Sequence, residues 1–323
     1  MTSDPAASSK TVLLTGGAGF LGSHFCAALL SRGDRVICVD SFLTGSANNL
    51  TAFADNPRFK LIRQDICEPL EINEPLDEVV NLACAASPPR YQADPVHTLM
   101  TSVVGTHNLL QLAEKHGARF LQASTSEIYG DPAVHPQAED YLGNVNCTGP
   151  RACYDEGKRA AEALCFDFLR LDRADVRVAR IFNTYGPRMQ PDDGRIVSNL
   201  INQALNGKPL TIYGDGEQTR SFCFVSDLIE GMIRLLRVET NPAAPVNLGN
   251  PREFTINNLA ELVVSQIGHP VSIVHEPLPK DDPRMRRPDI SRAKALLDWE
   301  PRVALEDGLV ETIDFFRKAR EVA

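Results

Sequence analysis

Two groups of residues in this chain carry side chains that could move protons. Tyr154 and Lys158 stand four positions apart, so on a helix they lie on one face. The stretch ASTSEIYG brings Thr125, Ser126 and Glu127 together where a strand is expected to end. A tyrosine acts as a base when its pKa falls from about 10, and a nearby ammonium favours the phenolate. The pattern predicts proton transfer at a hydroxyl; the alternative is a chance spacing on a solvated helix face.

A glycine pattern near the N-terminus could hold a nucleotide. Gly16, Gly19 and Gly22 follow an apolar run and open a helical segment. They permit a tight turn, a close approach to a pyrophosphate and close helix–strand packing, while the helix N–H groups face the phosphates. Asp40 ends the next strand-like run, where a carboxylate binds ribose hydroxyls and repels a 2′-phosphate. The pattern predicts NAD rather than NADP; the alternative is a glycine-rich turn with an incidental acid.

The order of elements in the first half predicts a parallel sheet with helices on both faces. Helical spacing marks three segments, at 23–33, about 95–115 and about 153–171. Asp94 is a candidate N-cap for the second, and Gly117 follows its end. Between the helices lie short apolar runs that fit buried strands, at 10–16, 34–40, 59–66, 77–84, 119–125 and 176–182.

After about residue 187 the segments become shorter and more mixed. Helices are expected at 195–207, 224–238 and 255–268, with two more at the end, and strands at 210–214, 245–249 and 271–276. We therefore expect a disordered tail at 1–10, a nucleotide-binding domain at 11–187 and a smaller substrate lobe at 188–323. The sequence has no linker at this boundary, so the chain could cross between the lobes.

Composition excludes several classes of protein. The chain has 323 residues, 43% of them hydrophobic and 23% charged, which suits a globular protein. A net charge of −9 argues against nucleic acid as a partner. No signal peptide or apolar run of about 18 residues is present, so we expect a soluble, cytoplasmic protein without a membrane partner. The eight cysteines lack CxxC or Cys/His ligand spacing, which predicts reduced thiols and no metal.

Four stretches carry a resemblance to a known family: STSEIYGDP, GPRACYDEGKR, RIFNTYGPRM and PVNLGNP. They resemble the UDP-glucuronate decarboxylases, also called UDP-xylose synthases, of the extended short-chain dehydrogenase/reductase superfamily, over about residues 11–318. The resemblance implies a Rossmann-type doubly wound parallel sheet with a smaller mixed α/β C-terminal lobe. It also implies NAD as cofactor, a UDP-sugar substrate and a homodimer formed through a four-helix bundle of helices 95–116 and 153–171.

The resemblance implies a reaction in three stages. The 4-hydroxyl of UDP-glucuronate is oxidised, the resulting β-keto acid loses CO2, and the same cofactor reduces C4 again to give UDP-xylose. In related 4,6-dehydratases the strand end reads Thr-Asp-Glu, and the Asp protonates a departing hydroxyl. This chain has Ser126 in its place and keeps Glu127, which disfavours loss of water. Glu127 is expected to act on water or C5; the alternative is that it only pairs with an arginine.

Site residues follow from these patterns and from the family's positions. The catalytic set is expected to be Tyr154, Lys158, Glu127, Thr125, Ser126 and Arg220. The cofactor set is Gly16, Gly19, Phe20, Leu21, Gly22, Asp40, Ser41, Phe42, Thr44, Gly45, Asp65, Ile66, Leu82, Ala83, Thr101, Lys158, Tyr185 and Arg188. The substrate set is Pro88, Arg90, Glu127, Asn183, Arg195, Ser198, Tyr213, Arg220 and Arg286, with Pro89 and Tyr91 in the same loop as Pro88.

One position departs from the family, and two other functions remain open. Met100 stands where many decarboxylase relatives have a lysine that contacts the pocket. A 4,6-dehydratase or 4-epimerase of the same superfamily is the neighbouring alternative. A regulator that binds NAD without catalysis is the alternative of a different class, and the presence of both Tyr154 and Lys158 argues against it.

Overall fold

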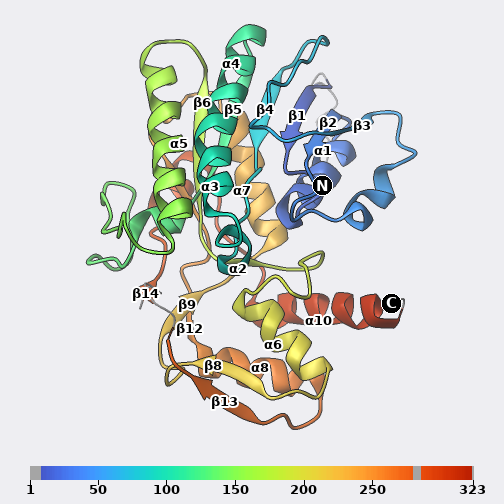
Figure 1. Cartoon of the computed structure of the whole chain (residues 1–323), viewed down its shortest axis with the longest axis vertical. Helices are drawn as coiled ribbons and strands as arrows, with labels where there is room; N and C mark the ends of the chain where they lie inside the picture. Colours follow the sequence, from blue (N-terminus) through green and yellow to red (C-terminus); the bar gives the residue numbers. More distant parts are fainter. Residues whose placement is uncertain (1–8, 279–284, 322–323) are drawn as a thin grey trace.

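The structure is a computed structural model, which describes residues 9–278 and 285–321. Residues 1–8 of the expected tail lie outside this part of the chain. Figure 1 shows a larger upper lobe built on a sheet and a smaller lower lobe that holds α6, β8, α8 and β13.

Seven of the described strands form the main sheet, and each neighbouring pair is parallel. The order is β11-β6-β5-β4-β1-β2-β3. Their bounds are β1 Thr11–Thr15, β2 Arg35–Asp40, β3 Phe59–Arg63, β4 Glu78–Asn81, β5 Arg119–Thr125, β6 Val176–Ile181 and β11 Val246–Leu248. From β1 the chain winds outward in both directions, which creates a crevice at the carboxyl ends of the strands. The predicted Rossmann-type fold is confirmed.

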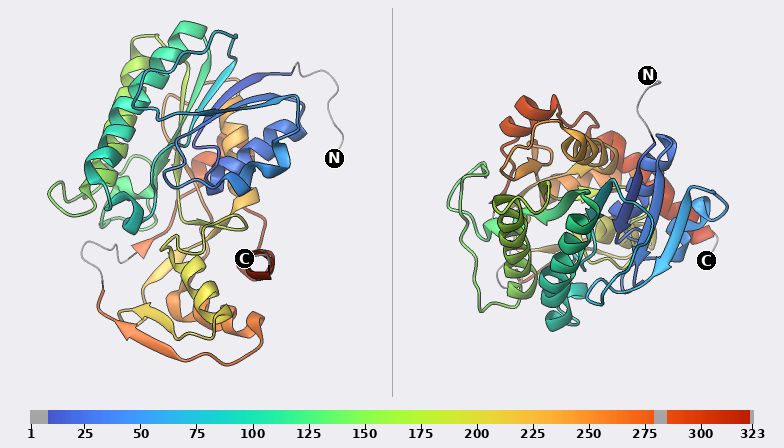
Figure 2. Two further views of the ribbon diagram at one scale, coloured as in Figure 1. Left: turned by 45° about the vertical axis from the view of Figure 1, so that its right-hand side comes forward. Right: turned by 90° about the horizontal axis from the view of Figure 1, so that it is seen from above.

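Helices cover both faces of this sheet, as Figure 2 shows from above. One layer contains α1 (Phe20–Ser31) and α7 (Val225–Arg237), which contact each other. The other layer contains α3 (Pro95–Met100), the π-helical turn η2 (Thr101–Gly105), α4 (Thr106–His116) and α5 (Ala152–Arg170).

The helix expected at 95–115 is present as the run α3, η2 and α4. Asp94 caps it by accepting a hydrogen bond from the His97 N–H, and Gly117 ends it at φ 62°. Sequence periodicity did not show the π-helical turn, because one wide turn barely changes which residues face the sheet.

Two strand predictions need correction in detail. β3 is an edge strand with a mostly exposed pattern, and Leu61 is 44% exposed, so it is not a buried strand. The strand expected at 245–249 belongs to the main sheet, because β11 pairs with β6. The chain therefore crosses back into the upper lobe after residue 187, bringing α7, β11 and α9 (Ser291–Leu297) with it. The domain limits themselves stay a prediction.

The lower lobe combines short strands with three helices. Its helices are α6 (Ile196–Leu205), α8 (Ile256–Ile267) and α10 (Leu305–Glu321), and β8 (Leu210–Tyr213) pairs with β13 (Ile273–Glu276). A sheet in the order β12-β9-β14 and a β10-β7 pair join the lobes. Their bounds are β7 Thr184–Tyr185, β9 Thr219–Ser221, β10 Cys223–Phe224, β12 Glu253–Thr255 and β14 Met285–Arg286. Short turns of helix complete the described chain: η1 Ala47–Phe53, α2 Pro88–Tyr91 and η3 Ser126–Tyr129.

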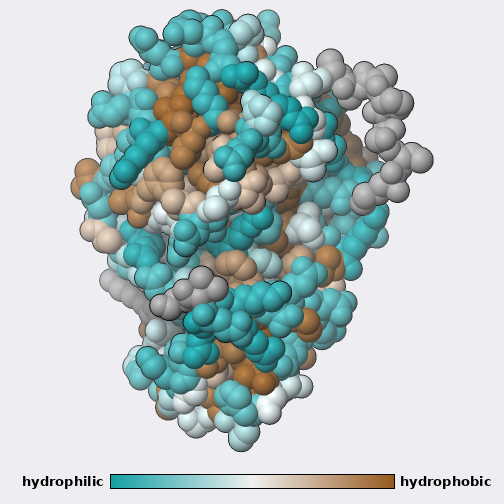
Figure 3. Space-filling view, turned by 90° about the vertical axis from the view of Figure 1, so that its right-hand side faces the viewer, coloured by the Kyte–Doolittle hydropathy of each residue, from teal (hydrophilic) through white to brown (hydrophobic). Residues whose placement is uncertain are grey.

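The surface exposes both hydrophobic and hydrophilic residues. On the side of the molecule drawn in Figure 3, hydrophobic residues group over the upper lobe, and the lower lobe is mostly hydrophilic with smaller hydrophobic spots. No helix among residues 9–278 and 285–321 is both long and apolar enough to cross a bilayer. All eight cysteines are free thiols, as predicted.

Candidate active site

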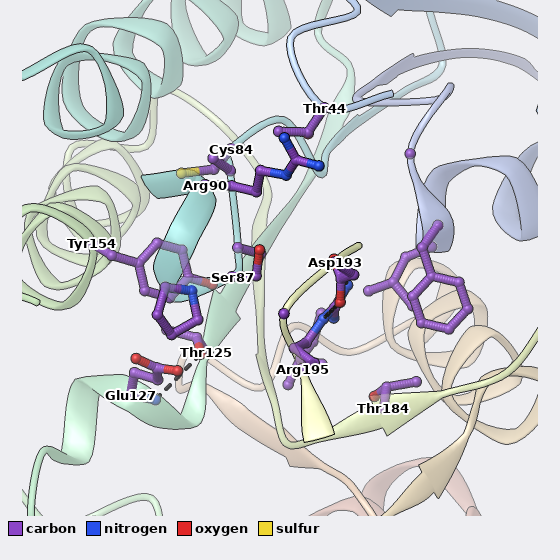
Figure 4. A pocket seen from close by; sticks show the side chains of 18 of the residues that line it. Thr44, Cys84, Ser87, Arg90, Thr125, Glu127, Tyr154, Thr184, Asp193 and Arg195 are labelled. Carbon is purple, nitrogen blue, oxygen red and sulfur yellow. Dashed lines mark hydrogen bonds and ion pairs between the residues drawn. The ribbon is translucent and has the colours of Figure 1, made fainter. Parts of the chain in front are cut away.

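A cavity of about 700 Å³ lies at the carboxyl ends of the sheet strands and reaches the lower lobe. Its upper wall includes the β1–α1 glycine turn and the ends of β2, β4 and β5, and its lower wall includes Tyr213, Arg220 and Arg286. Figure 4 shows Tyr154, Thr125 and Glu127 close together, while Asp193 and Arg195 lie on the segment across the pocket. The residues that are expected to move protons and the glycine pattern therefore line the same cavity.

The glycine turn leaves no room for larger residues. Gly16 has φ +73°, and a Cβ there would lie 2.8 Å from the Leu82 carbonyl carbon. A Cβ at Gly22 would lie 2.1 Å from the Gly16 carbonyl oxygen. The turn thus brings backbone close to the cavity at the start of α1, whose first N–H groups lack helical partners. This cradle fits a dinucleotide pyrophosphate.

Asp40 closes the same end of the cavity. Its carboxylate accepts hydrogen bonds of 2.8 Å from the Ala18 and Phe42 N–H groups. Burial raises the pKa of Asp40, and these two hydrogen bonds oppose the rise. One lone pair on each oxygen stays available, so the carboxylate can still accept from a ribose diol.

Asp65, Cys67 and His97 form a cluster beside this end. Their ligand atoms lie within 4.8 Å of one another, so in principle they could hold a metal ion. His97 Nε2 and Asp65 Oδ2 are 2.7 Å apart, and the Cys67 N–H donates to Asp65 Oδ1 over 2.8 Å. These hydrogen bonds explain why the three side chains lie close together. Sequence spacing did not suggest the cluster, because the fold brings Cys67 and His97 together from separate segments.

Tyr154 and Lys158 both line the cavity, from the first two turns of α5. The Lys158 ammonium donates to the Ala123 carbonyl over 2.9 Å and lies 5.8 Å from the centre of the Tyr154 ring. Burial raises the pKa of Tyr154 well above its ordinary value, and a hydrogen bond with Thr125 opposes the rise. Burial therefore dominates the pKa of Tyr154 in the protein by itself, and a lowering of this pKa by Lys158 together with a bound cofactor cation stays a prediction.

Glu127 is held by two arginines at the end of β5. Arg151 Nη2 lies 2.7 Å from its Oε2, and Arg286 Nη1 lies 3.4 Å from its Oε1. Burial raises the pKa of Glu127, but the charges of Arg286 and Arg151 outweigh burial and lower it to about 2. The alternative in which Glu127 pairs with an arginine thus matches the geometry, although Glu127 also lines the cavity.

Tyr91 lies against Tyr154 on the side of α2. The two rings are stacked, with centroids 5.0 Å apart and planes inclined by 3°. Tyr91 is fully buried, and its hydroxyl has no hydrogen-bond partner among the described residues. The stack fixes the plane of the Tyr154 ring, so Tyr91 is a positioning residue.

Several arginines could bind an anionic substrate. Arg286 is buried, and its Nε and Nη2 have no hydrogen-bond partner within the described chain. These two nitrogens form the edge of the guanidinium that binds a carboxylate or phosphate with two parallel bonds. Arg220 also lines the cavity, and its Nη1 donates to the Thr219 carbonyl over 2.8 Å. Arg195 pairs with Asp193, and Arg90 pairs with Asp192.

The structure brings most of the expected site residues to this cavity. Those that line it are Gly16, Gly19, Phe20, Leu21, Gly22, Asp40, Ser41, Thr44, Asp65, Ile66, Leu82, Ala83, Pro88, Arg90, Thr101, Thr125, Ser126, Glu127, Tyr154, Lys158, Asn183, Arg195, Tyr213, Arg220 and Arg286.

Five expected residues, and Met100, are absent from the described lining. Phe42 and Gly45 lie behind Asp40: the Phe42 N–H donates to its carboxylate, and a Cβ at Gly45 would be 3.0 Å from it. The Tyr185 hydroxyl donates to the Leu305 carbonyl, Arg188 donates to the Ser23 carbonyl, and Ser198 donates to the Arg195 carbonyl. Met100 is 44% exposed, so it does not replace the pocket contact that the lysine of the relatives is expected to make.

Sequence reasoning missed the partners that surround the proton-moving residues. Arg151 was visible in the specific stretch before Tyr154, but nothing in the local pattern linked it to Glu127. Asp155, which contacts Glu127, stands beside Tyr154 and reads as an ordinary first-turn acid of a helix. Arg151 and Asp155 could have been found by looking for charged residues within one helical turn of the candidate tyrosine.

The fold and cavity are those of a dinucleotide-binding enzyme. The family profile described as the NAD dependent epimerase/dehydratase family matches residues 12–249, and the chain belongs to this family.

Two groups of relatives are informative. The chain is 54% identical to UDP-glucuronic acid decarboxylase 4 of Arabidopsis thaliana over 95% of this chain and 68% of that protein. It is 52% identical to UDP-glucuronic acid decarboxylase 1 of Xenopus tropicalis over 97% and 73%. The structure of UDP-glucuronic acid 4-epimerase from Bacillus cereus, in complex with UDP-glucuronic acid and NAD, matches with a TM-score of 0.85 at 29% identity, covering 96% of this chain and 99% of that chain.

The stacked ring gives a prediction for stability. Tyr91→Leu removes the aromatic pair and leaves space beside Tyr154, so it should lower the free energy of unfolding by about 2 kcal/mol. Tyr91→Phe keeps the stack and removes a buried hydroxyl that lacks a partner, so it should be neutral or stabilising. Denaturant unfolding of both variants measures the difference. Equal losses for the two variants would show that the hydroxyl has a partner.

Proposed function

We propose that this chain catalyses the NAD-dependent decarboxylation of UDP-glucuronate to UDP-xylose. The observation that carries the proposal is the identity of more than half the residues with the UDP-glucuronic acid decarboxylases over nearly the whole chain. The cavity agrees with it, because it combines a nucleotide cradle, a tyrosine–lysine pair and unpartnered arginine nitrogens suited to an anion.

NAD fits the upper end of the cavity. The turn at Gly16 and Gly22 would hold the pyrophosphate, Asp40 would hold the ribose hydroxyls, and Asp65 with Ile66 would hold the adenine. When bound, NAD⁺ would supply a hydride acceptor and donor for C4 of the sugar and a positive charge that favours an ionised tyrosine.

Tyr154 and its neighbours handle the proton of the 4-hydroxyl. Tyr154 removes this proton when C4 is oxidised and gives it back when C4 is reduced. Thr125 hydrogen-bonds the phenol and so favours its ionised form. Lys158, fixed on the Ala123 carbonyl, keeps a positive charge close to the ring. The proton of Tyr154 therefore cycles within one turnover.

The residues around C5 favour loss of CO2 over loss of water. A ketone at C4 makes the substrate a β-keto acid, whose carboxylate leaves as its electrons pass into an enolate. Ser126 supplies no acid for a departing hydroxyl, which 4,6-dehydration needs. The partner-free edge of Arg286 can bind the substrate diphosphate or carboxylate, and Arg220 can bind the other group. Epimerisation is the remaining alternative, since solved 4-epimerases share the fold.

The purified protein with UDP-glucuronate should release CO2 and UDP-xylose. Tyr154→Phe keeps the ring and its stack but cannot accept the proton, so kcat should fall by about a hundredfold or more. Mass spectrometry of the sugar nucleotides identifies the product and measures how fast the wild type and Tyr154→Phe form it. Formation of the 4-epimer of UDP-glucuronate, or turnover of UDP-glucose or dTDP-glucose in place of UDP-glucuronate, would contradict the assignment.

Arg286→Gln tests substrate binding. Loss of the bidentate, charge-assisted contact costs about 1.5–3 kcal/mol, which raises KM for UDP-glucuronate by roughly ten- to a hundredfold. Arg287→Gln is the matched control, because the side chain of Arg287 is 40% exposed and is absent from the described lining. Initial rates over a range of substrate concentrations give the KM of each variant. An unchanged KM for Arg286→Gln would remove this residue from the substrate site.

We further infer that the protein is a homodimer formed through α3 and α5. Val96, Leu99 and Met100 on α3 are 71%, 37% and 44% exposed, and α3 packs against α5. Their spacing places apolar side chains on the outer side of this helix pair, where a second copy would cover them. A cytoplasmic location also fits, since eight free thiols suit a reducing compartment.

Placing a charge in this apolar row should separate the dimer. Met100→Glu buries a carboxylate in the interface, so the mass measured by light scattering should fall from two chains to one. Val310→Glu is the control, because Val310 is 50% exposed on α10, away from α3 and α5 in Figure 1. A wild-type protein with the mass of a single chain would refute the dimer.

A further inference from the structure

Three side chains of metal-binding type meet at the end of the cavity where adenine is expected. Asp65 and Cys67 follow β3, and His97 is in the first turn of α3. Their ligand atoms all lie within 4.8 Å of one another. Asp65 and His97 line the cavity, and Cys67 is a half-buried free thiol beside them. The proposed reaction uses neither the Cys67 thiol nor the His97 imidazole.

Hydrogen bonds hold the turn that carries Asp65 and Cys67. The Cys67 N–H donates to Asp65 Oδ1 over 2.8 Å, and Asp65 Oδ2 lies 2.7 Å from His97 Nε2. The side-chain amide of Asn108, on α4, donates to the carbonyls of Ile66 and Cys67 over 2.9 and 3.2 Å. Two of the three ligands therefore come from a turn that is anchored to a helix, so an ion that binds them does not have to order the backbone first.

The third ligand, His97, is held by the start of α3. Its backbone N–H donates to the Asp94 carboxylate over 3.0 Å, and its carbonyl accepts from Thr101 Oγ1 over 2.8 Å. Because the Thr101 hydroxyl gives its only proton to that carbonyl, the thiol is the donor in the 3.6 Å contact between Cys67 Sγ and Thr101 Oγ1. The sulfur lone pairs are therefore available to a metal ion once the thiol loses its proton.

The types of ligand and their separations suit Zn²⁺. A thiolate, an imidazole and a carboxylate are the groups that bind this ion, whereas Mg²⁺ prefers six oxygen ligands. Tetrahedral Zn²⁺ places neighbouring ligand atoms about 3.3–3.6 Å apart. Asp65 Oδ2 and His97 Nε2 are closer than this, at 2.7 Å, and their side chains are 31% and 32% exposed. Movements on the order of 1 Å in these partly exposed side chains therefore complete the geometry.

We propose that Asp65, Cys67 and His97 bind one Zn²⁺ ion and that this ion and NAD exclude each other. The thiol releases its proton to solvent, the imidazole binds through Nε2 with its proton on Nδ1, and a water molecule completes the tetrahedron from the cavity. The exclusion rests on the proposed placement of NAD, because Asp65 cannot offer Oδ2 to adenine while that oxygen binds the ion. Zn²⁺ is therefore an inhibitor that competes with the cofactor.

Co²⁺ tests the site directly, because a thiolate bound to Co²⁺ gives a charge-transfer absorption. The reduced wild-type protein should develop this absorption, saturate at one ion per chain and lose the signal when Zn²⁺ is added. Cys67→Ser should abolish the absorption and weaken Zn²⁺ binding, measured by calorimetry, by at least about a hundredfold. Cys147→Ser is the matched control, because Cys147 is an exposed free thiol outside the cluster. A wild type without the absorption, or a Cys67→Ser variant that keeps it, would overturn the site.

His97→Gln tests the second ligand. The amide oxygen of glutamine is a poorer ligand for Zn²⁺ than an imidazole nitrogen, so the affinity should fall by at least about tenfold. His269→Gln is the matched control, because His269 is exposed and lies outside the cluster. Denaturant unfolding of both variants with a chelator present shows whether they fold as the wild type does. Binding of Zn²⁺ to a folded His97→Gln as tightly as to the wild type would show that this cluster does not hold the ion.

Titration with NAD in the presence and absence of Zn²⁺ tests the exclusion. In the wild type, Zn²⁺ at about ten times its Kd should raise the apparent Kd of NAD about tenfold. Cys67→Ser should bind NAD as the wild type does with a chelator present, and the same amount of Zn²⁺ should leave its affinity unchanged. An NAD affinity that Zn²⁺ does not alter in the wild type would overturn the exclusion. A wild type that binds no NAD would overturn the exclusion together with the proposed function, and the Co²⁺ absorption would still decide whether the metal site exists.

Discussion

The ion pairs of Glu127 with Arg151 and Arg286 hold three parts of the molecule together at the cavity. Glu127 follows the end of β5, Arg151 precedes α5, and Arg286 comes from β14 beside the lower lobe. Breaking a buried pair by removing one partner costs about 3–5 kcal/mol, because the other charge is left without compensation. The position of the lower lobe against the sheet therefore depends on this cluster.

The charges of this cluster do not cancel, and the excess positive charge suits an anion. Two arginines pair with the single carboxylate of Glu127, so these three residues carry one net positive charge. Arg286 keeps two buried nitrogens without partners in the described chain, which is costly in a protein that never binds a negative group there. A nucleotide sugar with a diphosphate and a carboxylate supplies what this edge lacks. In the proposed function, stability and substrate binding therefore use the same guanidinium.

Local signals were enough to predict the upper lobe. The glycine turn, the cap at Asp94 and the buried strands other than β3 each depend on residues close in sequence, and the structure has them where they were expected. The strands β7, β9, β10, β12 and β14 have two or three residues each and form only because distant segments meet. Likewise, β11 reads as a strand of the second half, and only its pairing with β6 reveals that it extends the main sheet.

Most of the residues expected in the candidate site line one cavity, but the particular ion pairs around Glu127 were not predicted from the sequence. The sequence placed Tyr154, Lys158 and Glu127 in one cavity, and it offered pairing with an arginine as the rival to a chemical role for Glu127. The two interpretations are compatible, since the same contacts keep Glu127 ionised at the cavity wall. A carboxylate held so firmly cannot by itself be the acid that protonates C5.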